Sequence, residues 1–244
     1  MLELIDSMNT VCLSELDQVA LMNRIDNKYV LDAQQVALII PLIQNHYKVL
    51  EIEKNKIFTY ENNYFDTPNL QFYYDHHNGY LNRLKVRGRK YKESETSYFE
   101  IKRKENIDRT AKIREITTDL ISEIDENRKK IIQSHYRKNI ADLKIVLQNK
   151  FNRITFTNNE HTERITLDFN IQFSDNNQQK TFTNFFVLEI KQSKSNGRSI
   201  ISNTLKKNNI REQSFSKYIF GVIVLKEHIR KNNFLSLIKK INKL

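Results

Sequence analysis

The sequence predicts an α+β fold in which a β-sheet curls so that its charged side lines an interior and helices cover its apolar side. Three observations favour this fold. Several segments alternate charged and apolar residues with the two-residue period of a strand. Positive charge recurs on one such segment after another, and other segments have the period of an amphipathic helix. A half-exposed strand would also alternate, but like charges on neighbouring strands repel each other. We therefore expect an anion or interleaved carboxylates to neutralise the charged face.

Length and composition predict one domain, residues 1–244, because no linker or internal repeat divides the 244 residues. The net charge of +11 favours an anionic partner, which could be nucleic acid, a phosphorylated metabolite or an acidic lipid surface. The single Cys12 excludes an internal disulfide and a cysteine-based metal site. No apolar run has the length of a membrane span, and the N-terminus lacks the basic region of a signal peptide. We expect a cytoplasmic protein without a transmembrane segment, which would reach a membrane only through a membrane-protein partner or a charged surface.

Five segments are predicted as strands. In residues 83–89 every odd position is basic, so that Lys85, Arg87 and Arg89 share one face. In residues 98–104 the even positions after the tyrosine are a glutamate and two lysines. Residues 24–29, 164–171 and 185–191 alternate in the same way.

Four segments are predicted as helices. Asp32 can cap the N-terminus of the first, in which Pro41 would bend or break the helix. The others are residues 119–147 as one long helix or two, the short segment 200–210, and the basic amphipathic segment 225–244.

The basic strand residues are candidates for phosphate binding. Arginine forks match phosphate oxygens, and Arg87 and Arg89 could grip neighbouring phosphates. The alternative is a basic edge strand that resists aggregation, and Arg24, Asp26 and Lys28 alone are more typical of a surface strand. The candidates are Arg24, Lys28, Lys85, Arg87, Arg89, Lys102, Lys104, Arg114, Arg153, Arg164, Lys191 and Lys217, and Lys112 extends the same set.

Glu189 lies within a strongly apolar strand, where a carboxylate needs a cationic partner. That partner could be Lys191 or an arginine, or it could be Mg²⁺ or Mn²⁺ bridging to phosphate. The histidines are scattered and do not form a transition-metal set, and the sequence contains no P-loop, dinucleotide-binding or hydrolase motif.

Taken in order, these blocks resemble the VTC-type polyphosphate polymerase domain, a branch of the triphosphate tunnel metalloenzymes (CYTH-like superfamily). Each block alone is weak, but the ordered set covers nearly the whole chain and is specific. The matching blocks are residues 24–29, 64–68, 73–79, 85–91 and 99–102, Arg153, and residues 164–168, 188–191 and 216–218.

The resemblance implies an eight-stranded antiparallel β-barrel with helices packed on its outside, whose basic tunnel holds triphosphate or polyphosphate. It also implies a divalent metal, Mg²⁺ or Mn²⁺, on Glu189. The positions that match the family's phosphate-binding residues are Lys28, Arg87, Arg89, Lys102, Arg153, Arg164 and Lys217. Of these, Arg87, Arg89, Arg153 and Arg164 would be catalytic, because they would neutralise charge on the phosphate oxygens.

Two departures from the family pattern stand out. Phe151 occupies a position where the family often has tyrosine, which removes a phenol hydrogen bond to phosphate. The paired-glutamate strand of the wider superfamily is replaced by Arg24, Asp26 and Lys28. This replacement favours the VTC branch over the thiamine-triphosphatase and adenylate-cyclase branches.

The expected function is transfer of the γ-phosphate of ATP to a growing polyphosphate chain. One alternative is an inorganic triphosphatase in the same tunnel. Another is a non-catalytic protein that binds polyphosphate or nucleic acid. The sequence lacks a recognised nucleic-acid-binding module, so we expect no specific nucleic acid partner.

Overall fold

The computed structural model describes residues 2–17, 24–105, 110–140, 142–193 and 199–241. Eight strands form a continuous sheet in the order β2-β11-β9-β8-β4-β5-β6-β7, and three short strands join its sides. The strands are β1 (Thr10–Val11), β2 (Arg24–Leu31), β3 (Tyr47–Leu50), β4 (Phe58–Asp66), β5 (Arg83–Tyr91), β6 (Thr96–Lys104), β7 (Thr110–Thr117), β8 (Lys144–Asn158), β9 (Glu163–Ser174), β10 (Gln179–Phe182) and β11 (Phe186–Ser193). The helices are α1 (Leu2–Asp6), α2 (Leu13–Asp17), α3 (Ala33–His46), α4 (Gln71–His77), α5 (Glu126–Ser134), α6 (Ile200–Lys207), α7 (Lys217–Leu225), the 3₁₀ turn η1 (Asn232–Phe234) and α8 (Leu235–Ile241).

The predicted antiparallel α+β architecture is confirmed, since every neighbouring pair along the eight-strand path is antiparallel. The sheet curls but does not close, because the described parts of β2 and β7 form no ladder with each other. The outer edge of β2 is instead met by the segment before α7, in which the Gln213 backbone N–H donates to the Lys28 carbonyl at 2.7 Å.

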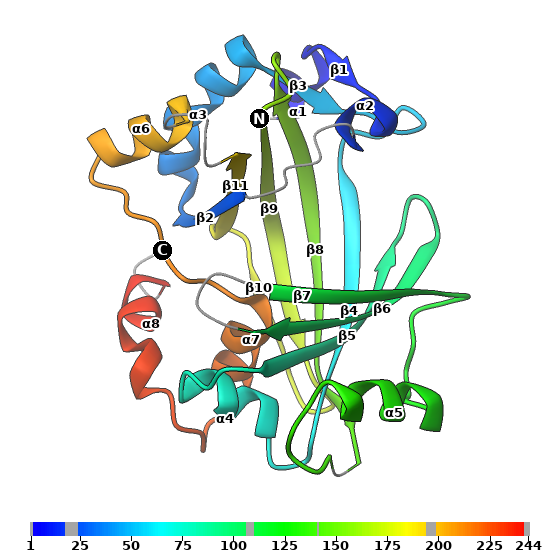
Figure 1. Cartoon of the computed structure of the whole chain (residues 1–244). Coiled ribbons are helices and arrows are strands. Elements are labelled where there is room, and N and C mark those ends of the chain that lie inside the picture. Colours follow the sequence, from blue (N-terminus) through cyan, green and yellow to red (C-terminus); the bar gives the residue numbers. More distant parts are fainter. Residues whose placement is uncertain (1, 18–23, 106–109, 141, 194–198, 242–244) are drawn as a thin grey trace.

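Helices cover the outer, apolar face of the sheet, as the alternation predicts. Val36 and Ile39 of α3 are buried in one cluster with Leu167 of β9. Ile132 of α5 is buried in another cluster with Val86 of β5. Figure 1 shows α3 and α6 together near one end of the sheet and α5 near the other. Burial of these apolar faces leaves the opposite, charged face on the inside of the curl.

The helix α7 packs against one end of the inner face. There the strands carry apolar residues, and Phe151 of β8 and Val187 of β11 form a buried cluster with Ile219 and Val222 of α7. The first residue of this helix, Lys217, consequently lies beside the charged part of the interior, where its ammonium group contacts Asp168.

The predicted helix after Asp32 is confirmed, because the Asp32 carboxylate accepts from the Gln35 backbone N–H in a capping box. Pro41 lies inside α3 without ending it, since proline removes only one hydrogen bond from a helix whose buried face continues to Ile43. The short helix predicted at residues 200–210 is also confirmed, as α6. No helix among the described residues has the length and apolar character needed to cross a membrane.

Two helix predictions are wrong in part. In the segment 119–147 only α5 is helical, and residues from Lys144 onward form β8, because pairing with β4 overrides the helical period of a short apolar stretch. The segment 225–244 was predicted as one helix, but α7 ends at Leu225 and only η1 and α8 follow, with residues 242–244 outside the described part. The last carbonyls of α7 accept from side chains of the β9–β10 hairpin, Lys180 at 2.6 Å among them, which satisfies the helix end.

Candidate functional site

Strand register places the predicted basic residues of the first half-sheet on one face. Directly opposite residues in an antiparallel pair share a face. Arg87 lies opposite Tyr64 of β4 and Glu100 of β6, and Glu100 lies opposite Arg114 of β7. The parity of the apolar residues puts this face on the inside of the curled sheet.

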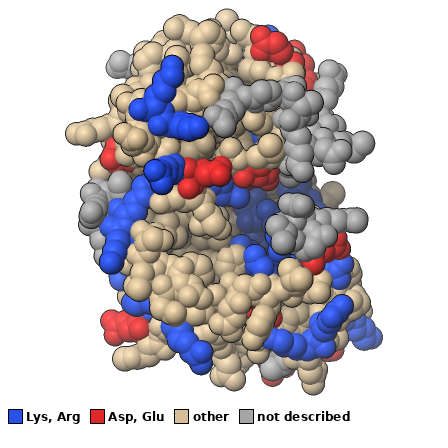
Figure 2. Space-filling model, turned by 60° about the vertical axis from the view of Figure 1, so that its left-hand side comes forward, with Lys and Arg blue, Asp and Glu red and all other residues tan. Residues whose placement is uncertain are grey.

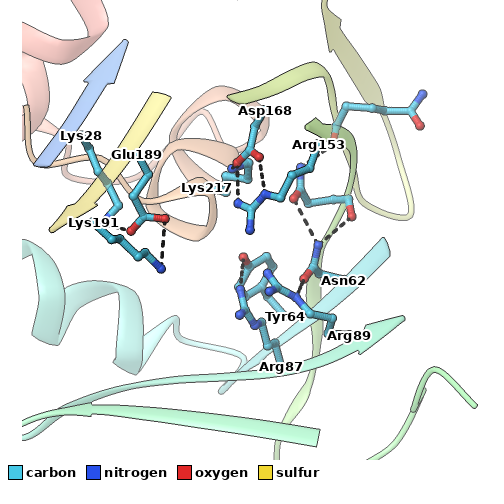
Figure 3. A network of polar contacts seen from close by, with 12 residues as sticks. Lys28, Asn62, Tyr64, Arg87, Arg89, Arg153, Asp168, Glu189, Lys191 and Lys217 are labelled. Carbon is cyan, nitrogen blue, oxygen red and sulfur yellow. Dashed lines mark hydrogen bonds and ion pairs between the residues drawn. The ribbon is translucent and has the colours of Figure 1, made fainter. Parts of the chain in front are cut away.

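The second half-sheet presents its charges to the same interior. Lys28 of β2 lies opposite Glu189 of β11, and Arg153 of β8 lies opposite Asp168 of β9. Figure 3 shows these side chains and those of β4 and β5 converging on one central space. In Figure 2 a groove lined by basic and acidic side chains crosses the molecule at mid-height.

Gly88 lies between Arg87 and Arg89 on β5. It points to the outer face, where an added Cβ would lie 2.6 Å from the Ile121 side chain, so glycine allows the chain after β7 to pack directly on β5. Because β5 is hydrogen-bonded to both β4 and β6, Arg87 and Arg89 lie on a central strand. The alternative of a basic edge strand is therefore wrong.

Glu100 is a fully buried carboxylate that gathers three cations. Arg87 donates to it through Nε at 2.7 Å and Nη2 at 2.5 Å, Arg114 donates through Nε at 2.8 Å, and the Lys112 ammonium lies 2.7 Å away. Burial alone would raise the pKa of the Glu100 carboxyl, but the charges of Arg87, Arg89 and Lys112 hold it well below its usual range. Glu100 thus stays ionised and fixes the guanidinium groups.

Asp168 holds cations in place on the other side of the interior, as Glu100 does. It accepts two hydrogen bonds from Arg153, at 2.5 and 2.8 Å, and contacts the Lys217 ammonium. The ammonium of Lys217 also lies 4.2 Å from the centre of the Phe151 ring, and that ring stacks on Tyr60 at 5.1 Å. Phe151 therefore supports a cation through its ring face in place of a phenol hydrogen bond.

Arg89 is buried, and its direct contacts are with the uncharged residues Asn62, Tyr60 and Tyr91. Its Nε donates to Asn62 Oδ1 at 2.8 Å, and its guanidinium lies 5.3 Å from the Tyr60 ring and 5.9 Å from the Tyr91 ring. Burial, followed by the charge of Arg87, lowers the pKa of Arg89. This guanidinium is held in place but its charge is available to an anion.

Three lysines lie directly opposite one another across β5, β6 and β7. Lys85 pairs with Lys102, and Lys102 pairs with Lys112. Among the described residues no carboxylate lies within salt-bridge distance of Lys85 or Lys102. Repulsion from Arg87 lowers the pKa of Lys102, whose side chain is exposed, to about 6, and burial, followed by the charge of Lys28, lowers the pKa of Lys85 to about 7. Like charges in this register are unfavourable unless an anion lies among them.

Glu189 has looser partners than the other two carboxylates. Its oxygens lie 3.3 Å from the Lys28 ammonium and 3.6 Å from that of Lys191, and its side chain is 15% exposed. Burial would raise the pKa of Glu189, but Lys191, Lys28 and Arg153 together hold it well below its usual range. No cluster of three or more metal-ligating side chains occurs in the described part of the chain. One ionised carboxylate fits Mg²⁺ or Mn²⁺ when phosphate oxygens and water supply the remaining ligands.

The other predicted residues occupy the margins. Arg164 lies opposite Lys191, on the same face of β9 as Asp168. Lys104 ends β6 opposite Thr110. Arg24 begins β2, but its side chain is outside the part of the chain that the structure describes.

Sequence reasoning named the cations but missed the residues that position them. Glu100 and Asp168 alternate in phase with the basic residues of their strands, which was a usable signal. Asn62 and Tyr64 accept hydrogen bonds from Arg89 and Arg87. Tyr64 begins the matching block 64–68, whereas nothing in the local sequence of β4 separates Asn62 from ordinary strand residues.

Comparison with known proteins supports the fold. The VTC domain family matches residues 23–226. A candidate adenylyl cyclase from Hippeastrum, whose structure is described as revealing a dominant triphosphatase activity, superimposes with a TM-score of 0.54 at 11% identity, covering 85% of this chain and 98% of that one. A candidate adenylate cyclase from Vibrio parahaemolyticus gives a TM-score of 0.48 at 12% identity, covering 81% of this chain and 96% of that one. No curated protein sequence matches the chain.

Proposed function

The chain belongs to the VTC domain family, and on this premise we propose that it binds triphosphate or polyphosphate in the basic interior. We further propose that it transfers the γ-phosphate of ATP to a growing polyphosphate chain with Mg²⁺ or Mn²⁺. The observation that carries the proposal is the row formed by Lys85, Lys102 and Lys112, in which Lys112 alone has a carboxylate at salt-bridge distance in the described part of the chain. A row of opposed lysines is unfavourable in a folded protein by itself, and a phosphate chain supplies an anionic oxygen at each unit to neutralise it.

The arginines stabilise the transferred group. Arg87 and Arg153 are held by the buried carboxylates Glu100 and Asp168, so their guanidinium groups are oriented before the substrate binds. Fixed donors of this kind stabilise charge on the equatorial oxygens without reorganisation during the reaction. Arg89 and Arg164 add charge from the neighbouring positions. Glu189 would hold a divalent cation, which would supply further positive charge to the phosphate oxygens.

Synthesis needs no proton acceptor from the protein, whereas hydrolysis needs one. In synthesis a terminal oxygen of the polyphosphate chain attacks the γ-phosphorus, the bond between this phosphorus and the β–γ bridging oxygen breaks, and ADP leaves. That oxygen is already anionic and needs no general base. Attack by water would release a proton, and Glu100 and Asp168 are poor acceptors because neighbouring cations lower the pKa of each carboxyl after burial has raised it.

Inorganic triphosphatase activity is the second candidate. It is favoured by the Hippeastrum protein of similar fold, whose described activity is that of a triphosphatase. The two activities would use the same cations and differ only in the acceptor.

Incubation of the purified protein with ATP and Mn²⁺, followed by resolution of the products on a gel, tests the proposal. A ladder of lengthening polyphosphate is the expected result. Orthophosphate without polymer would indicate that the protein hydrolyses its substrate and does not synthesise polyphosphate. Tight binding of polyphosphate without turnover would indicate a non-catalytic polyphosphate-binding protein. The cytoplasmic location, the single domain and the membrane-protein partner stay predictions.

A further inference from the structure

Lys102 occupies the middle of the row of lysines on the inner face. Its neighbours across β5 and β7 are Lys85 and Lys112, and among the described residues only Lys112 of the three has a carboxylate within salt-bridge distance. Lys102 is also exposed, whereas Lys85 is half-buried. A small molecule that enters the interior can therefore reach the amino group of Lys102, which no described carboxylate holds in place.

The charged groups around Lys102 make its amine a nucleophile. Arg87 and Arg89 lie on the same face, and repulsion from Arg87 lowers the pKa of Lys102 to about 6. The carboxylates of Glu100 and Glu189 act in the opposite direction but do not offset this repulsion. The amine is consequently unprotonated for the most part at neutral pH, and neighbouring cations activate a lysine nucleophile in this way.

Other lysines lack this combination of exposure and free lone pair. Lys217 also has a lowered pKa, of about 8, but its ammonium contacts Asp168 and its side chain is only 11% exposed. Lys90 points to the opposite face of β5, where its ammonium lies 2.8 Å from Asp119. The hydrogen bond to Asp119 raises the pKa of Lys90, so this amine stays protonated.

Cations that can bind a phosphate group lie within reach of the Lys102 amine. Because Lys85 pairs with Lys102 and Arg87 pairs with Glu100, Arg87 is the diagonal neighbour of Lys102 on the inner face. Diagonal neighbours on one face of an antiparallel pair lie about 7–8 Å apart, a distance that long side chains can bridge. A ligand that carries an electrophilic carbon next to its phosphate would therefore present that carbon to Lys102 when the arginines bind the phosphate.

We infer that Lys102 is acylated by acyl phosphates, which the basic interior binds through their phosphate group. The Nζ lone pair forms a bond to the carbonyl carbon, the bond between this carbon and the bridging oxygen breaks, and orthophosphate leaves with the electron pair. A proton of the amine passes to the departing phosphate, and the product is an amide. The inference rests on the phosphate site of the proposed function and adds a regulation of it, because the amide cannot gain charge when a phosphate chain binds.

Peptide mass spectrometry after incubation of the purified protein with acetyl phosphate at pH 7.5 tests the inference. Relative to an ordinary lysine, the lowered pKa raises the unprotonated fraction of Lys102 by about 1,000-fold. A less basic amine is a weaker nucleophile, as is known for thiols, so Lys102 should be acetylated at least about tenfold faster than Lys90 in the same chain. Tripolyphosphate should slow the acetylation of Lys102 and not that of Lys90. With N-hydroxysuccinimidyl acetate, an acetyl donor without phosphate, the preference for Lys102 should be smaller.

Calorimetry measures the consequence of the modification. Treatment with acetyl phosphate should weaken the binding of tripolyphosphate by about tenfold, as expected for the loss of one charged partner of a phosphate. Lys102→Arg is the matched variant, because its guanidinium is always protonated and has no amine to acetylate. The affinity of this variant for tripolyphosphate should be the same before and after treatment.

Each outcome decides between the inference and the proposed function. Acetylation of Lys102 no faster than that of Lys90, in a protein that binds tripolyphosphate, overturns the inference and leaves the proposed function intact. Rapid acetylation that tripolyphosphate does not slow, or an equal preference with both donors, also overturns the inference, since the amine would then react without recognition of phosphate. Failure of the untreated protein to bind tripolyphosphate overturns the proposed function and, with it, the inference. The mass-spectrometric comparison uses the unaltered chain, so it decides even if Lys102→Arg does not fold.

Discussion

Replacing Glu189 with glutamine separates a metal ligand from a structural ion pair. Glutamine keeps the shape of the side chain and removes the negative charge that a hard divalent cation requires. If Glu189 holds the metal, turnover of ATP with Mn²⁺ should fall by at least about 100-fold. Binding of tripolyphosphate without metal should be unchanged or tighter, because the interior becomes more positive.

The expected loss of stability is small, as the distances show. Attraction between Glu189 and ammonium groups at 3.3 and 3.6 Å is about 5 kcal/mol each at an effective dielectric constant of about 20. The cost of taking these groups out of water cancels most of this attraction, and the side chains of Lys28 and Lys191 are 33% and 20% exposed. A net loss of about 1 kcal/mol would lower the Tm by roughly 2–4 °C.

Glu100→Gln is the matched control, since it makes the same chemical change on the same face. Glu100 is fully buried and lies 2.5–2.8 Å from its cations. Removing its charge leaves those cations unpaired and should cost about 3–5 kcal/mol, which lowers the Tm by roughly 6–20 °C. Thermal unfolding and product gels on both variants are the measurements. A Tm loss in Glu189→Gln as large as that in Glu100→Gln, with turnover surviving in the folded fraction, would refute the metal role.

Three further predictions concern ligand binding. Tripolyphosphate should raise the Tm more than orthophosphate does, and the difference should shrink with added salt; equal shifts from sulfate, orthophosphate and tripolyphosphate would indicate general anion screening. Arg89→Ala should weaken tripolyphosphate binding by about tenfold or more, whereas Lys90→Ala on the opposite face should not, and equal affinities measured by calorimetry would contradict the assignment. The pKa values of Lys85 and Lys102 are lowered to about 7 and 6 in the free protein, and a bound anion raises them. Binding of tripolyphosphate at pH 8 should therefore take up protons, and its affinity should fall as the pH rises above about 6. Calorimetry in buffers of different ionisation enthalpy measures this uptake, which should decrease in Lys102→Met; proton release instead would disprove it.

The sequence predicts the inner face well because strand alternation is a local property. The parity of residues 83–89 assigns Arg87 and Arg89 to one face without knowledge of the neighbouring strands, and the register of β5 agrees. The partners of these arginines come from other strands, and local sequence does not determine which strand pairs with β5. The error at residues 144–147 has the same origin, because their strand conformation depends on pairing with β4, more than seventy positions away.

The interior contains two kinds of cation, which differ in whether a buried carboxylate holds them in place. Arg87 and Arg153 are fixed by buried carboxylates, so their positions are set by the fold whether or not an anion is present. Such preorganised groups are suited to stabilising a transition state. Lys85 and Lys102 have no carboxylate partner in the described part of the chain, and their lowered pKa values make their charge depend on the ligand. These lysines can therefore gain charge as phosphate enters and lose it as the chain leaves. Under the proposed function, a polymer that moves through the interior without being trapped would need cations of this second kind, while the reacting phosphate would need the first.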